Sequence, residues 1–93
     1  MATIKITGTL TGAGGNRWGR LIRDAAERAP RCLVLDLSET PRVDETALVM
    51  LLQVHRALEC RVGLLVLQAP RPAVRNMFRL GRIDSVLHIE DAV

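Results

Sequence analysis

Apolar and polar positions follow two patterns that predict strands. In residues 3–10 they alternate with a period of two, which is typical of a half-buried strand. Residues 32–37 and 61–68 contain short, continuous apolar runs, as in strands that are covered on both faces. A last short strand is predicted over residues 85–91. The chain therefore carries four strand patterns, spread from one end to the other.

Between these strands, three segments place apolar residues at helical spacing. The first helix is predicted to follow a glycine-rich turn at 11–15, to have Asn16 as its N-cap and to end at Pro30. The second runs over about residues 44–60 and the third over about 69–82. Each helix is long enough to connect two parallel strands by crossing over the sheet.

This alternation predicts an α/β fold, with a mixed, largely parallel sheet of four to five strands and helices packed on it. The 93 residues are enough for one small domain, and 48% hydrophobic residues are enough for a packed core. No linker, internal repeat or low-complexity tract interrupts the pattern. We therefore expect a single domain over residues 1–93.

Composition argues against several classes of function. Trp18 and Phe78 are the only aromatic residues, so the chain lacks the stacking platforms that usually bind single-stranded nucleic acid. No apolar run approaches the ~20 residues of a membrane span, and no signal-peptide pattern is present. A net charge of +3 is compatible with nucleic acid, anionic lipid or an acidic protein as a partner, and it is too small to decide among them. We expect a cytoplasmic protein without direct nucleic-acid binding or membrane insertion.

Candidate catalytic and cofactor residues do not combine into a recognisable site. His55 falls on the apolar side of its helix, and His88 has no evident serine or cysteine partner. Cys32 and Cys60 have no metal-ligand or redox spacing, and both are expected to be buried thiols. The glycine-rich turn lacks the third glycine of a dinucleotide fingerprint, because Arg17 occupies that position. We therefore expect no enzyme, no metal and no cofactor.

The helix predicted over residues 44–60 has two apolar sides. At 100° per residue, one side should face the sheet: Ala47, Leu48, Leu51, Val54, His55 and Leu58. The outer side contains Thr46, Val49, Met50, Gln53 and Ala57. A solvated helix face would carry lysine and glutamate, so this outer side is typical of a contact surface, unless another element of the domain covers it.

The order of short motifs resembles that of the STAS domain, the fold of bacterial anti-sigma factor antagonists. That family has an apolar strand ending in Asp-Leu-Ser, a helix opened by Asp-Ser-Ser-Gly-Leu, a further strand, a proline-containing segment and Leu-x-Gly-hydrophobic-Asp. The matching segments here are residues 34–38, 44–48, 63–67, 70–74 and 80–84. The resemblance extends over most of the chain from Ile6 onward.

The resemblance implies a partner switch that is controlled by phosphorylation. In the family, the unphosphorylated antagonist binds an anti-sigma factor that is also a serine/threonine kinase, phosphorylation releases it, and a phosphatase resets the cycle. Thr46 aligns with the phosphoacceptor and Asp44 with the acid of the motif. Glu45 replaces the first serine, Ala47 the glycine, and Thr11 an earlier acid of the family.

The predicted helix start fits this role. Asp44 is suited to cap the helix, and Thr46 lies in its first turn, where a phosphate would add about two negative charges to the edge of a neutral surface. We therefore expect phosphorylation at Thr46 and no cofactor. The expected partner-binding residues are Asp44, Glu45, Thr46, Val49, Met50 and Gln53.

Several alternatives stay open. One is a STAS subunit that docks constitutively on the ATPase of a lipid-trafficking ABC transporter through a similar helix face. Another is a small module that binds a nucleotide at the glycine-rich turn. Ser38 and Ser85 are other hydroxyls that could be phosphorylated, although both read as turn or cap residues. The oligomeric state is open as well. Four arginines form a stripe that is either a solvated face or a docking surface: Arg71, Arg75, Arg79 and Arg82.

Overall fold

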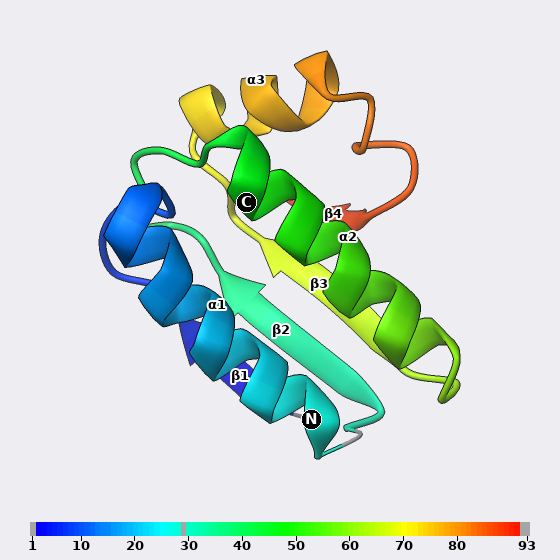
Figure 1. Cartoon of the computed structure of the whole chain (residues 1–93). Coiled ribbons are helices and arrows are strands. Elements are labelled where there is room, and N and C mark those ends of the chain that lie inside the picture. The colour runs from blue at the N-terminus through cyan, green and yellow to red at the C-terminus, as the bar shows by residue number, and fades with distance from the viewer. Residues whose placement is uncertain (1, 29, 92–93) are drawn as a thin grey trace.

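A parallel four-stranded sheet forms the centre of the fold (Figure 1). The computed structural model describes residues 2–28 and 30–91. The strands lie in the order of the chain: β1 (Ala2–Lys5), β2 (Cys32–Asp36), β3 (Leu64–Gln68) and β4 (His88–Glu90). The connections between them contain α1 (Gly12–Glu27), α2 (Glu45–Glu59) and α3 (Pro72–Leu80). The predicted α/β class is confirmed, and every pairing among the described strands is parallel.

The core lies between the sheet and the helices, and α3 contributes Val74 and Phe78 to it. α1 and α2 cover the same face of the sheet, and α3 lies at the end where the strands terminate (Figure 1). Four leucines of the central strands join the core cluster with residues of these helices: Leu33, Leu35, Leu65 and Leu67. Val34 and Val66 pair with each other on the opposite face and are also buried. Burial on both faces explains why β2 and β3 read as continuous apolar runs.

α1 begins earlier than the sequence pattern predicts. It starts at Gly12, so the glycine-rich segment forms its first turn, and the prediction that Asn16 caps the helix is wrong. The reason is tertiary packing, which overrides the low helix propensity of glycine. A Cβ on Gly14 would lie only 2.8 Å from the carbonyl oxygen of Thr9. This close approach accounts for a glycine at that position without any phosphate ligand.

The other boundaries follow local signals. α2 begins one residue after its cap Asp44, as predicted. α3 has Pro72 in its first turn and Gly81 as its C-cap, so it is shorter than the predicted 69–82 and leaves Arg71 and Arg82 outside the helix. β3 begins only at Leu64, because a tight turn follows α2.

That turn holds Val62 in the left-handed region, with φ of 58° and 93% of the residue exposed. A branched side chain is strained in this conformation, and so exposed a residue gains almost no packing in return. We expect Val62→Gly to raise the free energy of unfolding by about 1 kcal/mol in urea denaturation. The control is Val49→Gly within α2, which should lower it. A lower free energy of unfolding in Val62→Gly would show that the left-handed backbone at this position does not strain the valine.

Candidate partner-binding site

Asp44 joins the beginnings of α1 and α2. Its Oδ1 accepts a hydrogen bond from the backbone N–H of Ala47 at 2.8 Å, which confirms the predicted N-cap. Its Oδ2 accepts a second hydrogen bond from the N–H of Gly12 at 3.2 Å, and its own N–H donates to the carbonyl of Leu10 at 3.2 Å. The first turns of both helices are therefore held together by one carboxylate, and this holds the first turn of α2 in place.

Removing this carboxylate should loosen both helix starts. We expect Asp44→Ala to lower the free energy of unfolding by about 1–2 kcal/mol, because it deletes an N-cap and the bond to Gly12. Asp44→Asn should lose less, since its single amide oxygen still caps a helix well. Guanidinium denaturation of the three proteins measures both differences. Equal stability of Asp44→Ala and the unaltered protein would mean that the carboxylate does not hold the two helices.

Most of the predicted site residues lie on the surface of α2. Glu45 and Thr46 are exposed in its first turn, and Gln53 is exposed two turns further on. Val49 is 53% exposed, which is unusual for an apolar residue in the middle of a helix that packs on a sheet. Asp44 is half-buried beneath them. The first three turns of α2 thus combine a hydroxyl, a carboxylate and an apolar side chain.

Met50 is the exception among the predicted partner-binding residues. It is only 4% exposed, so the prediction that it lies on the outer surface is wrong. α1 packs beside this part of α2, and Gly19 makes room for the methionine. The Cγ of Met50 lies 3.6 Å from the place that a Cβ on Gly19 would take. The outer side of α2 is therefore partly covered by another element of the same domain.

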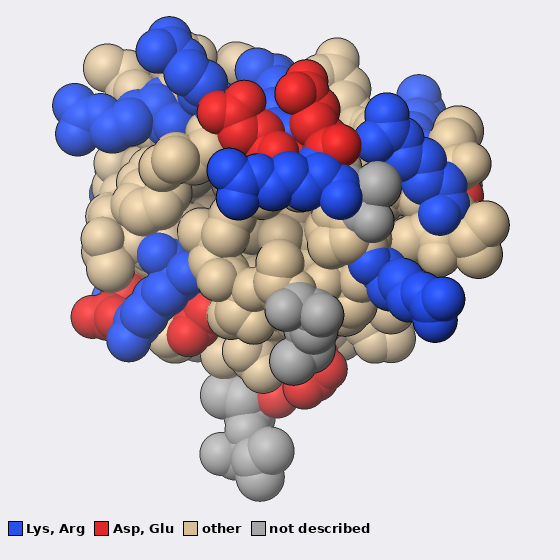
Figure 2. Space-filling view, turned by 90° about the horizontal axis from the view of Figure 1, so that it is seen from below, with Lys and Arg blue, Asp and Glu red and all other residues tan. Residues whose placement is uncertain are grey.

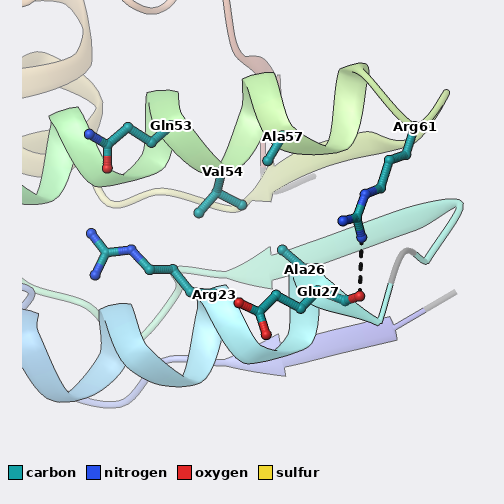
Figure 3. Close-up of a pocket in the computed structure, with 7 residues that line it drawn as sticks. All are labelled: Arg23, Ala26, Glu27, Gln53, Val54, Ala57 and Arg61. Atoms are coloured by element: carbon teal, nitrogen blue, oxygen red, sulfur yellow. Dashed lines mark hydrogen bonds between the residues drawn. The ribbon is translucent and has the colours of Figure 1, made fainter.

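A groove runs between α1 and α2 and begins at the predicted phosphoacceptor. Its upper part has a volume of about 250 Å³ and is lined by Thr46 and Met50 of α2 and by Gly15 and Arg23 of α1, among others. Its lower part, of about 230 Å³, lies between Arg23 and Arg61 (Figure 3). Arg23 lines both parts, so the two hollows adjoin. We call them together the α1–α2 groove.

The contribution of α1 to this site was missed in the sequence. Gly12, Gly15 and Gly19 all line the upper part of the groove, at intervals of three and four residues. This spacing places them on one face of a helix. It indicates a helix that starts at residue 12 and approaches a neighbour closely, whereas the low helix propensity of glycine favours the predicted turn at 11–15.

The remaining candidate residues lie apart from the groove. His55 is half-buried, with its Nε2 3.6 Å from the carboxylate of Glu59, and His88 is exposed on β4. Cys32 is half-buried and Cys60 is exposed, so the expectation that both are buried is wrong; Cys60 follows the end of α2 at the surface. Within residues 2–28 and 30–91, no three His, Cys, Asp or Glu side chains gather as metal ligands.

The two alternative phosphoacceptors belong to turns. The N–H of Ser38 donates to Asp36 at 2.9 Å, and hydrogen bonds from Ser38 lower the pKa of the Asp36 carboxyl. The carbonyl of Ser38 accepts a bond from Arg71 at 2.9 Å. The hydroxyl of Ser85 lies 3.5 Å from the carbonyl of Arg82. Both serines therefore lie in turns, as their sequence context predicts.

The predicted arginine stripe is not continuous. Arg71 is bound to the loop after β2, Arg75 pairs with Asp91, and Arg82 lies beyond the end of α3. Basic side chains are also dispersed at the lower end of the molecule, where acidic groups lie among them (Figure 2). The net charge of +3 does not form one continuous patch on that face. No helix among the described residues has the length and apolar character of a membrane span.

Comparison with known proteins agrees with this architecture. The structure of the anti-sigma factor antagonist SpoIIAA in its unphosphorylated form superposes with a TM-score of 0.81 and 22% identity, over 98% of this chain and 78% of that one. A Thermotoga maritima protein assigned as an anti-sigma factor antagonist gives a TM-score of 0.80 and 17% identity, over 96% and 74% of the two chains. At these identities the likeness shows the fold. No curated protein was found to match the sequence.

The family assignment has a separate basis in the sequence. The family model of the STAS domain matches residues 1–93. This match agrees with the order of motifs along the chain and with the parallel sheet. The chain therefore belongs to the STAS domain family.

Proposed function

We propose that the protein is an anti-sigma factor antagonist that works as a phosphorylation-controlled partner switch in the cytoplasm. In its unphosphorylated form it binds an anti-sigma factor that is also a serine/threonine kinase. Phosphorylation of Thr46 ends that contact, and a phosphatase restores it. The protein itself is a binding module and needs no cofactor. The observation that carries the proposal is the exposed Thr46 in the first turn of α2, aligned with the family's phosphoacceptor.

The surroundings of Thr46 suit a switch of this kind. It is the only hydroxyl residue in the motif 44–48, because Glu45 stands where the family has its first serine. Asp44 fixes the helix start through two hydrogen bonds, so the position of Thr46 does not depend on the partner. The exposed Val49 lies one turn further along the helix and offers an apolar contact. A charge at position 46 therefore stands at the edge of the surface that the partner would cover.

The covalent step is a phosphoryl transfer from ATP. The Oγ1 of Thr46 forms a bond to the γ-phosphorus, the bond from that phosphorus to the β,γ-bridging oxygen breaks, and ADP leaves. The hydroxyl proton passes to a base on the kinase. The product carries about two negative charges next to Glu45, and a docked partner would have to desolvate them or place its own charges against them. Loss of binding needs no change in the fold.

The experiment that tests the proposal is affinity capture from the cytoplasm of the source cells, with and without ATP, followed by phosphosite mapping. Unaltered protein and Thr46→Ala should capture a kinase-like partner, and Thr46→Glu should not. With ATP, phosphate should map to Thr46. Phosphate on Ser38 or Ser85 with none on Thr46 would contradict the proposal. Equal capture of a transporter ATPase by all three proteins would show a constitutive docking subunit instead.

A further inference from the structure

Arg23 is an exposed residue that lines both parts of the α1–α2 groove. Its Nη1 lies 4.0 Å from the place that a Cβ on Gly19 would take, so the guanidinium folds back over that glycine. Within the described ranges 2–28 and 30–91, no carboxylate oxygen comes within 4.0 Å of it. Figure 3 shows the side chain extending along the groove toward Gln53 and away from the carboxylate of Glu27. The groove thus presents a cation that nothing in the described chain neutralises.

The walls around this cation are small and apolar. Ala26, Val54 and Ala57 line the lower part, and the short side chains leave its volume of about 230 Å³ open (Figure 3). At the far end, Arg61 donates a hydrogen bond to the carbonyl of Glu27 at 3.1 Å, so a second cation lies there. A segment that complements this groove needs small or branched apolar side chains and at least one carboxylate.

The acidic groups that face the groove do not neutralise Arg23, so the groove still favours a segment that carries a carboxylate. The oxygens of Asp44 at the upper end accept hydrogen bonds from two backbone N–H groups. Glu27 lines the lower part, and its carboxylate extends toward the base of the Arg23 side chain, whose guanidinium runs the other way, toward Gln53 (Figure 3). No ion pair joins the two side chains. A carboxylate brought in by another chain would therefore meet the Arg23 guanidinium first, in a charge-assisted hydrogen bond.

We propose that the α1–α2 groove receives an acidic, amphipathic segment of the partner, with a carboxylate on Arg23 and apolar side chains against Ala26, Val54 and Ala57. This inference rests on the proposed function for the identity of the partner and adds the chemistry of the segment. It also explains why phosphorylation would weaken binding of the partner and not strengthen it. Thr46 lines the upper part of the same groove, so a phosphate there repels the acidic segment and competes for Arg23.

A defined peptide tests the groove without the partner. We would titrate ¹⁵N-labelled protein with a synthetic amphipathic helical peptide that has leucine and alanine on one face and glutamate on the other. The glutamate peptide should shift the backbone amide signals of Gly15, Gly19, Gln53 and Ala57. A second peptide with lysine in place of glutamate should not. Added salt should weaken the binding of the glutamate peptide, because the contact to Arg23 is partly exposed.

Two charge reversals on α1 distinguish binding in the groove from a general effect of the protein's net charge on peptide affinity. Arg23→Glu should weaken binding of the glutamate peptide at least about tenfold, the equivalent of 1.4 kcal/mol. Arg20→Glu makes the same change of charge on the exposed side of α1, outside the groove, and should change the affinity less than twofold. Arg23→Ala, which removes the charge without reversing it, should lie between them. Circular dichroism verifies that all variants are folded.

The inference is overturned if the lysine peptide binds as well as the glutamate peptide, if neither binds, or if Arg20→Glu weakens binding as much as Arg23→Glu. Because the titration uses unmodified protein and no kinase, its result is independent of whether Thr46 is phosphorylated in cells. If the titration fails, the phosphorylation switch still stands, with a docking surface around Val49 in place of the groove. If no phosphate is found on Thr46, the switch is wrong, but binding of an acidic segment in the groove still stands.

Discussion

Replacing Phe78 by alanine should lower the free energy of unfolding by about 3–5 kcal/mol, the largest effect we expect from truncating one side chain. Phe78 is fully buried and, within residues 2–28 and 30–91, is the largest of the completely buried side chains. It belongs to the core cluster that also contains Val74 of the same helix and Leu48 of α2. Its removal deletes buried apolar surface and leaves a cavity that close-packed neighbours fill only in part.

For a domain of this size such a loss is a large fraction of the total stability. Guanidinium denaturation of Phe78→Ala measures the difference directly. Leu80→Ala is the matched control, because Leu80 is in the same helix but is 70% exposed and should change stability by no more than about 0.5 kcal/mol. If Phe78→Ala fails to fold, Phe78→Leu should still show a milder loss. Equal effects at both positions would mean that α3 is not anchored as described.

Thr46→Glu should weaken binding of the kinase partner about 100-fold, which corresponds to about 2.8 kcal/mol. A permanent charge at the edge of the partner surface imitates the phosphate in part, and unfavourable juxtaposed charges across an interface cost several kcal/mol. Thr46→Ser should bind normally and still accept phosphate, whereas Thr46→Ala should bind normally and accept none. Titration calorimetry with the captured partner measures all three affinities.

Ser85→Glu is the control for this effect, because it introduces the same charge at another exposed hydroxyl, in the turn before β4. It should leave the affinity unchanged within about twofold. The circular dichroism spectra of Thr46→Glu and the unaltered protein should coincide, since Thr46 is exposed. A Thr46→Glu protein that binds the partner normally would show that position 46 lies outside the interface.

The arrangement of strands and helices could be predicted because burial leaves a direct trace in the sequence. β2 and β3 are buried on both faces, so their apolar runs are continuous. The start of α2 could be placed within one residue, because Asp44 is both the cap and the residue before an apolar repeat. The start of α1 could not, since glycine ordinarily breaks helices and the contacts that require it here involve Thr9, Leu10 and Met50.

The partner surface could be predicted only in part, for a similar reason. A helical wheel of α2 shows which residues face away from the sheet, but it does not show which of these residues a neighbouring helix covers. The wheel therefore predicts Met50 on the surface, although α1 buries it at Gly19. The position of Arg23 in the groove could not be predicted, because it depends on two helices that lie side by side and on a glycine one turn before it. Such features become visible only when the elements are placed in space.

Phosphorylation of Thr46 should separate the protein from its partner. The most direct test is native mass spectrometry of the purified complex before and after addition of ATP. The switch predicts that the unaltered complex dissociates, that phosphate maps to Thr46, and that the Thr46→Ala complex persists in ATP. A complex that stays intact in ATP, or one that dissociates equally with Thr46→Ala, would contradict it.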